Sequence, residues 1–354
     1  MILNQNSDFI FGFEAKMTNP NGDPDQENKP RMDYETSTVL VSDARRKRDI
    51  RDFLKRKGYP IFVDTLADKK VPMDKMFESI RDQWLNDEDN FTKLLNEETI
   101  LQEKWNQLVD GQNGNFKELY EKMSKDKKKK SLFVDFNNSF MTAIIKKSLI
   151  DIRLFGSAMA VEGITRTFTG PVQISWGYSL HPVELVKSNT ITSIMNDDAS
   201  TFGKKHKLYY ALITHYGTMN KYSAKLTGMT EQDREIFRKA LIQGIMNNQT
   251  DSKQGQSPLF YLEIIYAKDF DGYIGDLRRF IQVHYNEEKS IREIHHLTID
   301  FSKLSSVIEE MKKNGYIDNV VGWFHPYVDD SIFRHMPEYV SLDLWQPIAN
   351  KVEG

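Results

Sequence analysis

The chain has 354 residues, which is enough for one large domain or two modest ones with a real hydrophobic core. Its formal net charge of −3 does not mark a nucleic-acid-binding protein, so such a function would have to come from local basic patches. It contains no cysteine, which excludes disulfide scaffolds, thiol catalysis and cysteine-ligated metal centres. No apolar run approaches membrane length and the first residues lack a signal-peptide pattern, so we expect a cytoplasmic protein with no membrane partner.

Residues 9–57 predict a strand, a polar loop and a basic helix. Along the strand, alternate apolar residues share one face, namely Phe9, Phe11, Phe13, Ala15 and Met17. The loop, 19–31, is rich in Asn, Pro, Gly and Asp, which favour tight turns over regular structure. Ser42 is the expected N-cap of the helix, which should end before Gly58.

Helical spacing divides the basic helix into faces. Ile50, Phe53 and Leu54 form a narrow apolar stripe. The basic residues on the opposite side are Arg45, Arg48, Arg51 and Lys55. Arg46 and Lys47 lie nearer the buried side, at the helix start. These charges suit either a solvated helix face or a phosphate-binding edge, and the adjacent polar loop favours the second interpretation.

A polar stretch from about 66 to 135 follows this first unit. Its apolar residues recur at loosely helical spacing, which predicts a helical insertion. The insertion contains the lysine run 125–130. Such a run is typical of a solvated loop, and nucleic-acid contact is the alternative.

The remaining segments predict further strands and helices. The expected elements are a helix over 141–160, an extended stretch over 165–180, a short basic turn at 201–206, strands at 208–216 and 258–266, and a helix near 302–313. Gly170-Pro171 interrupts the extended stretch, as at a bulge or sheet edge. Thr230 begins another helix in capping fashion. The segment from about 270 to 354 is expected to be a C-terminal elaboration.

Without the insertions, the order is strand, helix, strand, strand, helix, strand, as in ferredoxin-like and RRM-like proteins. We therefore expect an α+β fold: a single RRM-like domain over residues 1–354, with insertions and no internal repeat. The strand at 208–216 lacks the aromatic pattern of a base-stacking RRM surface. Any RNA would then be held mainly through its backbone.

Motifs for catalysis are sparse. The chain has no phosphate loop, no Gly-x-Gly-x-x-Gly motif after a strand and no Gly-x-Ser-x-Gly motif. We expect no cofactor and no metal site. Asp23 and Asp25 are candidate nuclease carboxylates, but no third acidic residue or histidine lies at a diagnostic spacing.

Four segments, in this order, resemble one protein family. They are Asn19–Asp25 with Lys29–Arg31, Val41–Asp43 with Lys47–Arg51, Asp151–Gly156 with Phe168–Gln173, and Thr201–His206 with His215–Gly217. Together they resemble the CRISPR-associated backbone subunit of the Cascade surveillance complex, the seventh Cas family, most like its type I-B branch. The resemblance runs from about residue 9 to residue 266.

The resemblance implies a modified RRM core with a thumb-like hairpin and no catalytic activity. Copies would stack head to tail along a CRISPR RNA, beside other Cascade subunits, and leave the guide free to pair with target DNA. Related subunits of type III complexes cut target RNA with a loop aspartate. An endoribonuclease using Asp23 or Asp25 is therefore an alternative, and a protein-binding scaffold is another.

The resemblance also implies individual RNA contacts. Asn21 would lie near the guide, the first helix and the segment after residue 200 would bind phosphates, and residues near the thumb would approach the RNA. The full set is Asn21, Lys47, Arg48, Arg51, Arg166, Gly170, Gln173, Lys204, Lys205 and His206. The roles of Arg45 and Arg46 stay open, because the family is usually less basic at those positions.

Overall fold

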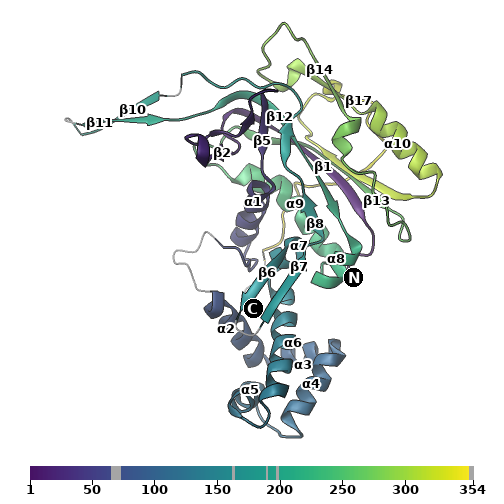
Figure 1. Cartoon of the computed structure of the whole chain (residues 1–354). Helices are drawn as coiled ribbons and strands as arrows, with labels where there is room; N and C mark the ends of the chain where they lie inside the picture. Colours follow the sequence, from purple (N-terminus) through teal and green to yellow (C-terminus); the bar gives the residue numbers. More distant parts are fainter. Residues whose placement is uncertain (65–72, 162–163, 189, 197–198, 351–354) are drawn as a thin grey trace.

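The structure, a computed structural model, describes residues 1–64, 73–161, 164–188, 190–196 and 199–350. It confirms the expected α+β class, with one large sheet through its upper part (Figure 1). In spatial order the sheet contains β18 (Val340–Ser341), β16 (Ile317–Phe324), β13 (Gln256–Tyr266), β1 (Ser7–Thr18), β12 (Leu208–Met219), β9 (Gly177–Ser179), β5 (Thr38–Val41) and β4 (Met32–Asp33). Strand β8 (Val172–Ile174) also pairs with β12.

Four strands and two helices form the core of this arrangement. Along the chain they follow the order β1, α1 (Asp43–Arg56), β9, β12, α9 (Glu231–Asn247) and β13. This is the strand and helix order predicted for a ferredoxin-like core. Strand β1 lies between β12 and β13 and is antiparallel to both. Its nearly continuous apolar run suits this central position, because both faces of the strand are covered.

Helices α1 and α9 cover one face of the sheet. Phe9, Phe11 and Phe13 of β1 are fully buried in the same apolar cluster as the stripes of the two helices. The helix residues in that cluster include Ile50, Phe53, Leu54, Phe237, Leu241 and Ile245. Met17 departs from the prediction. It is 46% exposed and has a φ of 51°, so the left-handed backbone breaks the strand's alternation at this residue.

Local signals place the ends of both core helices. Ser42 caps α1, with its Oγ accepting a hydrogen bond from the backbone N–H of Arg45 at 3.3 Å. Gly58 follows the helix with a φ of 80°. At α9, Thr230 and Asp233 form a reciprocal capping box. The predicted helix starts are therefore confirmed.

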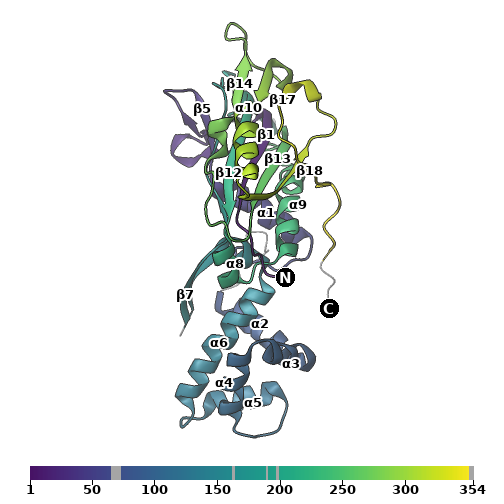
Figure 2. The same cartoon turned by 90° about the vertical axis from the view of Figure 1, so that its right-hand side faces the viewer.

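The C-terminal part of the chain covers the opposite face of the sheet. Helix α10 (Ser302–Lys313) lies over the strands in Figure 2, and the small sheet of β14 (Gln282–Tyr285), β15 (Leu297–Asp300) and β17 (Phe333–Arg334) lies near it. One apolar cluster joins sheet and cover and contains Ile10, Leu212, Phe260, Leu262, Ile299, Phe301, Leu304 and Ile308. Protein side chains thus occupy the sheet face on which an RRM stacks bases.

A second group of helices lies at the lower end of the molecule (Figure 1). It comprises α2 (Met73–Asn86), α3 (Glu88–Glu97), α4 (Thr99–Val109), α5 (Phe116–Lys125) and α6 (Lys130–Ser148). These helices share their own apolar cluster, centred on Phe91, Trp105, Phe136 and Phe140. The helices predicted for the polar insertion are thus present. The lysine run 125–130 lies at the turn between α5 and α6.

The segment after α6 differs from the prediction. The helix expected over 141–160 stops earlier: α6 ends at Ser148, and α7 (Ile150–Phe155) stops before Gly156, whose φ of 71° is unsuited to a helix. Residues 156–161 instead form β6 (Gly156–Val161), which pairs with β7 (Ile164–Thr169). The predicted break at Gly170-Pro171 is confirmed, because it separates β7 from β8.

A hairpin of β10 (Thr190–Asn196) and β11 (Ala199–Lys204) projects from the upper part of the molecule (Figure 1). The basic turn predicted at 201–206 is wrong, since residues up to Lys204 belong to this hairpin. The remaining short elements are β2 (Gly22–Asp23), β3 (Lys29–Pro30), α8 (Lys221–Thr227), and the 3-10 turns η1 (Pro24–Gln26), η2 (Leu277–Phe280), η3 (Ile294–His296) and η4 (Asp330–Ile332).

Candidate nucleic-acid interface

The polar loop 19–31 is a folded unit. Strands β2 and β3 pair within it, and the Nδ2 of Asn19 donates to the carbonyl of Asn28 at 2.8 Å. The carboxylate of Asp23 accepts hydrogen bonds from the backbone N–H of Asp25 at 3.2 Å and from Arg31 Nη2 at 3.3 Å. The short polar side chains that predicted turns therefore hold the loop in one shape.

Asn21 fixes this loop to the start of α1. Its Oδ1 accepts hydrogen bonds from the backbone N–H of Ser42 at 2.8 Å and from Ser42 Oγ at 3.0 Å. Ser42 is also the N-cap of the helix. The loop and the positive end of the helix dipole are thus joined through one asparagine.

Lys204 and Lys205 connect the base of the β10–β11 hairpin to two loops. Lys204 Nζ lies 3.4 Å from Glu27 Oε2 in loop 19–31, and this hydrogen bond is the main reason that the pKa of Glu27 is lowered. Lys205 Nζ lies 2.8 Å from Asp251 Oδ2 in the loop between α9 and β13. Both lysine side chains stay well exposed, at 61% and 45%. The next residue, His206, is half-buried.

The three predicted cations of α1 each contact an aspartate. Lys47 Nζ is 3.0 Å from Asp43 Oδ2, and Arg48 Nη1 is 3.3 Å from Asp52 Oδ1. Arg51 Nε is 3.0 Å from the Oδ2 of Asp151, which is buried. The Lys47–Asp43 and Arg48–Asp52 pairs are four residues apart on the helix, so the sequence spacing predicts them. The Arg51 pair joins segments far apart in the chain.

Phe155 brings the end of α7 into contact with α1. Lys47 Nζ lies 5.8 Å and the Arg51 guanidinium 5.0 Å from the centre of its ring, both over the ring. Gly170 packs against the backbone of the same residue, and a Cβ placed on Gly170 would lie 2.0 Å from the Phe155 carbonyl carbon. The absence of a side chain at Gly170 therefore lets the backbone of Phe155 lie close to it.

Two further predicted residues lie nearby. Gln173 is exposed on β8, and its Nε2 donates to the carbonyl of Gly170 at 2.8 Å. Arg166 belongs to β7, where it pairs with Met159, but its side chain lies outside the described part of the structure.

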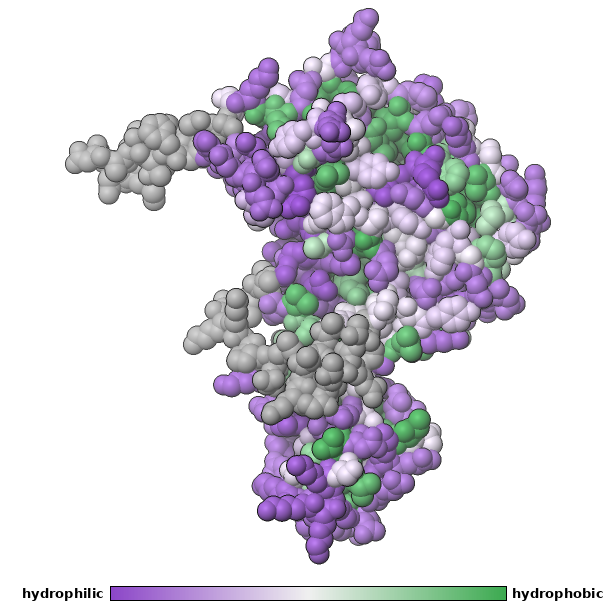
Figure 3. Space-filling model, in the orientation of Figure 1, coloured by the Kyte–Doolittle hydropathy of each residue, from purple (hydrophilic) through white to green (hydrophobic). Residues whose placement is uncertain are grey.

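The predicted residues form two groups that share a helix. Asn21, Lys204, Lys205 and His206 surround loop 19–31, while Lys47, Arg51, Gly170 and Gln173 surround Phe155. Helix α1 joins them, because Ser42 contacts Asn21 and the next residue, Asp43, pairs with Lys47. In Figure 1, β2, α1 and β6 lie along the same side of the molecule, between the projecting hairpin and the lower helices. Figure 3 shows mainly hydrophilic side chains along this side.

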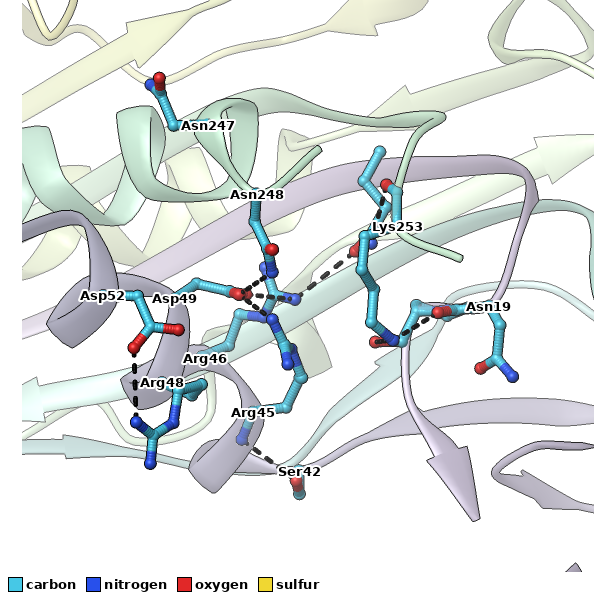
Figure 4. Close-up of polar contacts among 12 residues, drawn as sticks. Asn19, Ser42, Arg45, Arg46, Arg48, Asp49, Asp52, Asn247, Asn248 and Lys253 are labelled. Atoms are coloured by element: carbon cyan, nitrogen blue, oxygen red, sulfur yellow. Dashed lines mark hydrogen bonds and ion pairs between the residues drawn. The ribbon is translucent and has the colours of Figure 1, made fainter. Parts of the chain in front are cut away.

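Sequence reasoning missed a cation beside this surface. Lys253, in the loop between α9 and β13, donates to the carbonyl oxygens of Asn19 at 2.6 Å and Pro20 at 3.2 Å (Figure 4). Burial, with smaller effects from Arg45 and Arg46, lowers its pKa to about 8. No sequence pattern marks Lys253, because its neighbours come from segments far away in the chain.

Arg46 is buried beneath this lysine, as its position nearer the core side of α1 predicted. It is 1% exposed, lies 4.7 Å from the centre of the Phe13 ring and contacts Asp49 Oδ2 at 2.9 Å. Burial lowers its pKa to about 10. Arg45 also pairs with Asp49, and Asn248 Nδ2 donates to the same carboxylate at 2.5 Å (Figure 4).

The described residues contain neither a metal-binding cluster nor a helix suited to a membrane. No three His, Asp or Glu side chains among them are grouped so that they could hold a metal ion. No described helix combines the length and apolarity that crossing a membrane requires.

The fold and this surface define an α+β protein in which a polar loop, a basic helix and a projecting hairpin lie on the same side of the molecule. The family model for CRISPR-associated protein Cas7 matches residues 5–302, and the chain belongs to that family. A relative from Haloferax volcanii described as "CRISPR-associated protein Cas7" is 22% identical over 339 residues, which cover 89% of this chain and 86% of the relative.

A solved structure shares this fold. A chain from a structure described as "CRISPR RNA-guided surveillance complex, pre-nicking" matches with a TM-score of 0.52 and 12% identity, covering 94% of this chain and 96% of that one. A chain from a "CRISPR RNA-guided surveillance complex" matches more distantly, with a TM-score of 0.45 and 11% identity, covering 94% and 95%. The resemblance to the seventh Cas family is confirmed, and the type I-B branch stays a prediction.

Proposed function

We propose that this protein is a cytoplasmic, non-catalytic backbone subunit of a type I Cascade complex that holds CRISPR RNA by its phosphates. Membership of the Cas7 family supports this proposal. The observation that carries it is the grouping of Lys204, Lys205, Asn21 and Lys47 along one connected set of segments. A guide must be held without its sequence being read, so phosphate contacts should dominate.

The covered sheet face supports the same mode of binding. Because the C-terminal part packs on that face, bases cannot stack there as they do on an RRM. The bases of a bound guide would remain available for pairing with target DNA. This arrangement favours a carrier of the guide over a reader of its sequence.

The cations differ in how easily they can exchange an aspartate or glutamate for a phosphate. Lys204 and Lys205 are exposed, and surface ion pairs contribute little, so exchange there costs little. Lys47 is 16% exposed and its partner Asp43 is 32% exposed. Arg51 is 13% exposed and pairs with a buried carboxylate, so we assign it mainly to support of the helix. Lys47, Lys204 and Lys205 are the primary contacts in this proposal.

Copies of the chain would pack head to tail, beside other Cascade subunits. Such an interface is heterologous and open-ended, so the length of the RNA rather than the protein would set the number of copies. The projecting β10–β11 hairpin is the element that we expect to act as the thumb.

Neutralising the primary contacts tests the proposal. A variant with Lys47→Gln, Lys204→Gln and Lys205→Gln should bind RNA more weakly, and the slope of log affinity against log salt should fall by about 2, at about 0.7 per lost phosphate contact. The matched control neutralises Lys127 and Lys128, which are exposed on the turn before α6, and Lys130, which is exposed at the first residue of that helix. Wild-type affinity and slope in the Lys47, Lys204 and Lys205 variant would exclude the proposed contacts.

A further inference from the structure

Three cations lie close together where α1 meets the α9–β13 loop (Figure 4). Arg45 and Arg46 both pair with Asp49. Lys253 is near enough that both arginines lower its pKa, while Asp49 acts in the opposite direction. Its ammonium group donates hydrogen bonds to the carbonyl oxygens of Asn19 and Pro20 in loop 19–31. The cluster therefore holds more positive charge than the described residues compensate.

Some N–H donors of the two arginines have no hydrogen-bond acceptor among the described residues. Nε of Arg45, and Nε and Nη1 of Arg46, are buried without a hydrogen-bond partner among the described residues. Arg46 is 1% exposed, so it contributes positive potential from below and cannot itself touch a ligand. The Arg45 side chain is 21% exposed and Lys253 is half-buried, so both side chains can contact a ligand from solution. Buried donors without acceptors are uncommon and costly.

The cluster borders the contacts proposed above. Asp251, which pairs with Lys205, and Lys253 belong to the same loop. The carbonyl groups that Lys253 contacts precede Asn21, which in turn contacts the N-cap of α1. An RNA backbone that passes from Lys205 to Lys47 would therefore pass Arg45 and Lys253 on its way.

We propose that Arg45 and Lys253 together hold one phosphodiester group of the bound RNA, above the buried charge of Arg46. The proposal rests on the proposed function, because its ligand is the RNA backbone. A phosphodiester is a monoanion with two free oxygens, one for each donor. The neighbouring groups that face the lysine are Arg45, Arg46 and Asp49 on α1 and the carbonyl oxygens of Asn19 and Pro20.

A bound phosphate would change the protonation of Lys253. The pKa of Lys253 is about 8 without RNA, so at pH 8 roughly half of the amines carry the proton. A nearby anion favours the charged form and raises the pKa. Binding at pH 8 should therefore take up about half a proton per subunit from solution.

Isothermal titration calorimetry of the full chain with an unstructured uridine oligomer measures this uptake. Titrations are run at pH 8 in two buffers with different ionisation enthalpies, and affinity is measured across salt concentrations. Wild type should take up protons. Lys253→Gln should lose the uptake, bind several-fold more weakly and lower the salt slope by about 0.7. Lys253→Arg should keep the affinity within about twofold while losing the uptake, because a guanidinium stays protonated.

The variants separate the possible failures. Lys127→Gln is the control and should behave as wild type. If wild type binds RNA but Lys253→Arg still takes up protons, or Lys253→Gln keeps wild-type affinity and slope, this inference is overturned while the proposed function stands. If wild type does not bind RNA even at low salt, both fail. Because Lys253→Arg keeps the charge, it decides the matter even if Lys253→Gln unfolds the loop.

Discussion

Arg51 and Asp151 join two segments that are far apart in the chain. Arg51 Nε lies 3.0 Å from Asp151 Oδ2, and the same carboxylate accepts the backbone N–H groups of Phe62 at 2.8 Å and Val63 at 3.1 Å. Asp151 is 1% exposed. It therefore fixes α7, α1 and the chain leading toward the lower helices to one another.

Removing this carboxylate should cost much stability. Asp151→Ala leaves a mostly buried guanidinium and two backbone donors without their acceptor, so the free energy of unfolding should fall by about 3–5 kcal/mol. Asp52→Ala is the matched control, because Asp52 pairs with Arg48 within the same helix, is 20% exposed compared with 1% for Asp151, and should cost about 1 kcal/mol. Urea unfolding measures both, and similar losses would contradict the role assigned to Asp151.

Gly170 should not tolerate a side chain. Gly170→Ala places a Cβ 2.0 Å from the carbonyl carbon of Phe155, and backbone at that position cannot easily move away. We expect a loss of about 1–3 kcal/mol in the free energy of unfolding, as for other overpacked sites. At Gly114 the nearest atom to a new Cβ is 3.5 Å away, so Gly114→Ala should be nearly neutral in the same assay. A neutral Gly170→Ala would show that this contact is looser than the structure has it.

His215 should make stability depend on pH. Burial, with a smaller effect from Arg46, lowers its pKa from an ordinary 6.5 to about 3. The unfolded chain then binds the proton more readily than the folded chain. Stability is therefore fully present above pH 6.5 and is lost as pH falls toward 3, by up to about 1.4 kcal/mol per pH unit.

His215→Gln tests this dependence. Between pH 6.5 and pH 5, the variant should show a shallower loss of stability in urea unfolding than wild type. His296→Gln, at a ring that is 42% exposed, serves as the control. An unchanged slope in His215→Gln would assign the acid sensitivity to other groups.

Cleavage assays address the endoribonuclease alternative. Asp23 caps the turn inside loop 19–31 and pairs with Arg31, which is a structural use of its carboxylate. We expect no cleavage when the protein is incubated with guide, labelled complementary RNA and magnesium. Periodic cuts that Asp23→Ala abolishes would overturn the non-catalytic proposal. Asp25→Ala is the companion variant, since that carboxylate is exposed in the same loop.

Signals that act within a few residues were sufficient to predict much of the secondary structure. Ser42 marks the start of α1, Thr230 and Asp233 mark the start of α9, and the alternation from Phe9 to Ala15 marks the central strand. Their order along the chain was enough to expect an α+β fold. The ordered motifs also led to the family, which a family model covering residues 5–302 confirms.

The helix expected over 141–160 shows where local reasoning fails. Its apolar spacing continues past Phe155, but the positive φ of Gly156 ends α7 and the next residues pair with β7. Strand β7 follows β6 directly along the chain, so the hairpin that replaces the helix is also a local structure, and apolar spacing alone does not distinguish a short strand from a continued helix.

The tertiary structure alone decided which charges meet. The sequence by itself determined that α1 is basic and amphipathic and lies beside a polar loop. It did not determine that Arg51 lies on Asp151, that Lys253 contacts Asn19, or that the C-terminal part covers the second sheet face. The physical reason is that charge interaction and burial depend on distance in space, whereas helix and turn preferences depend on neighbours along the chain.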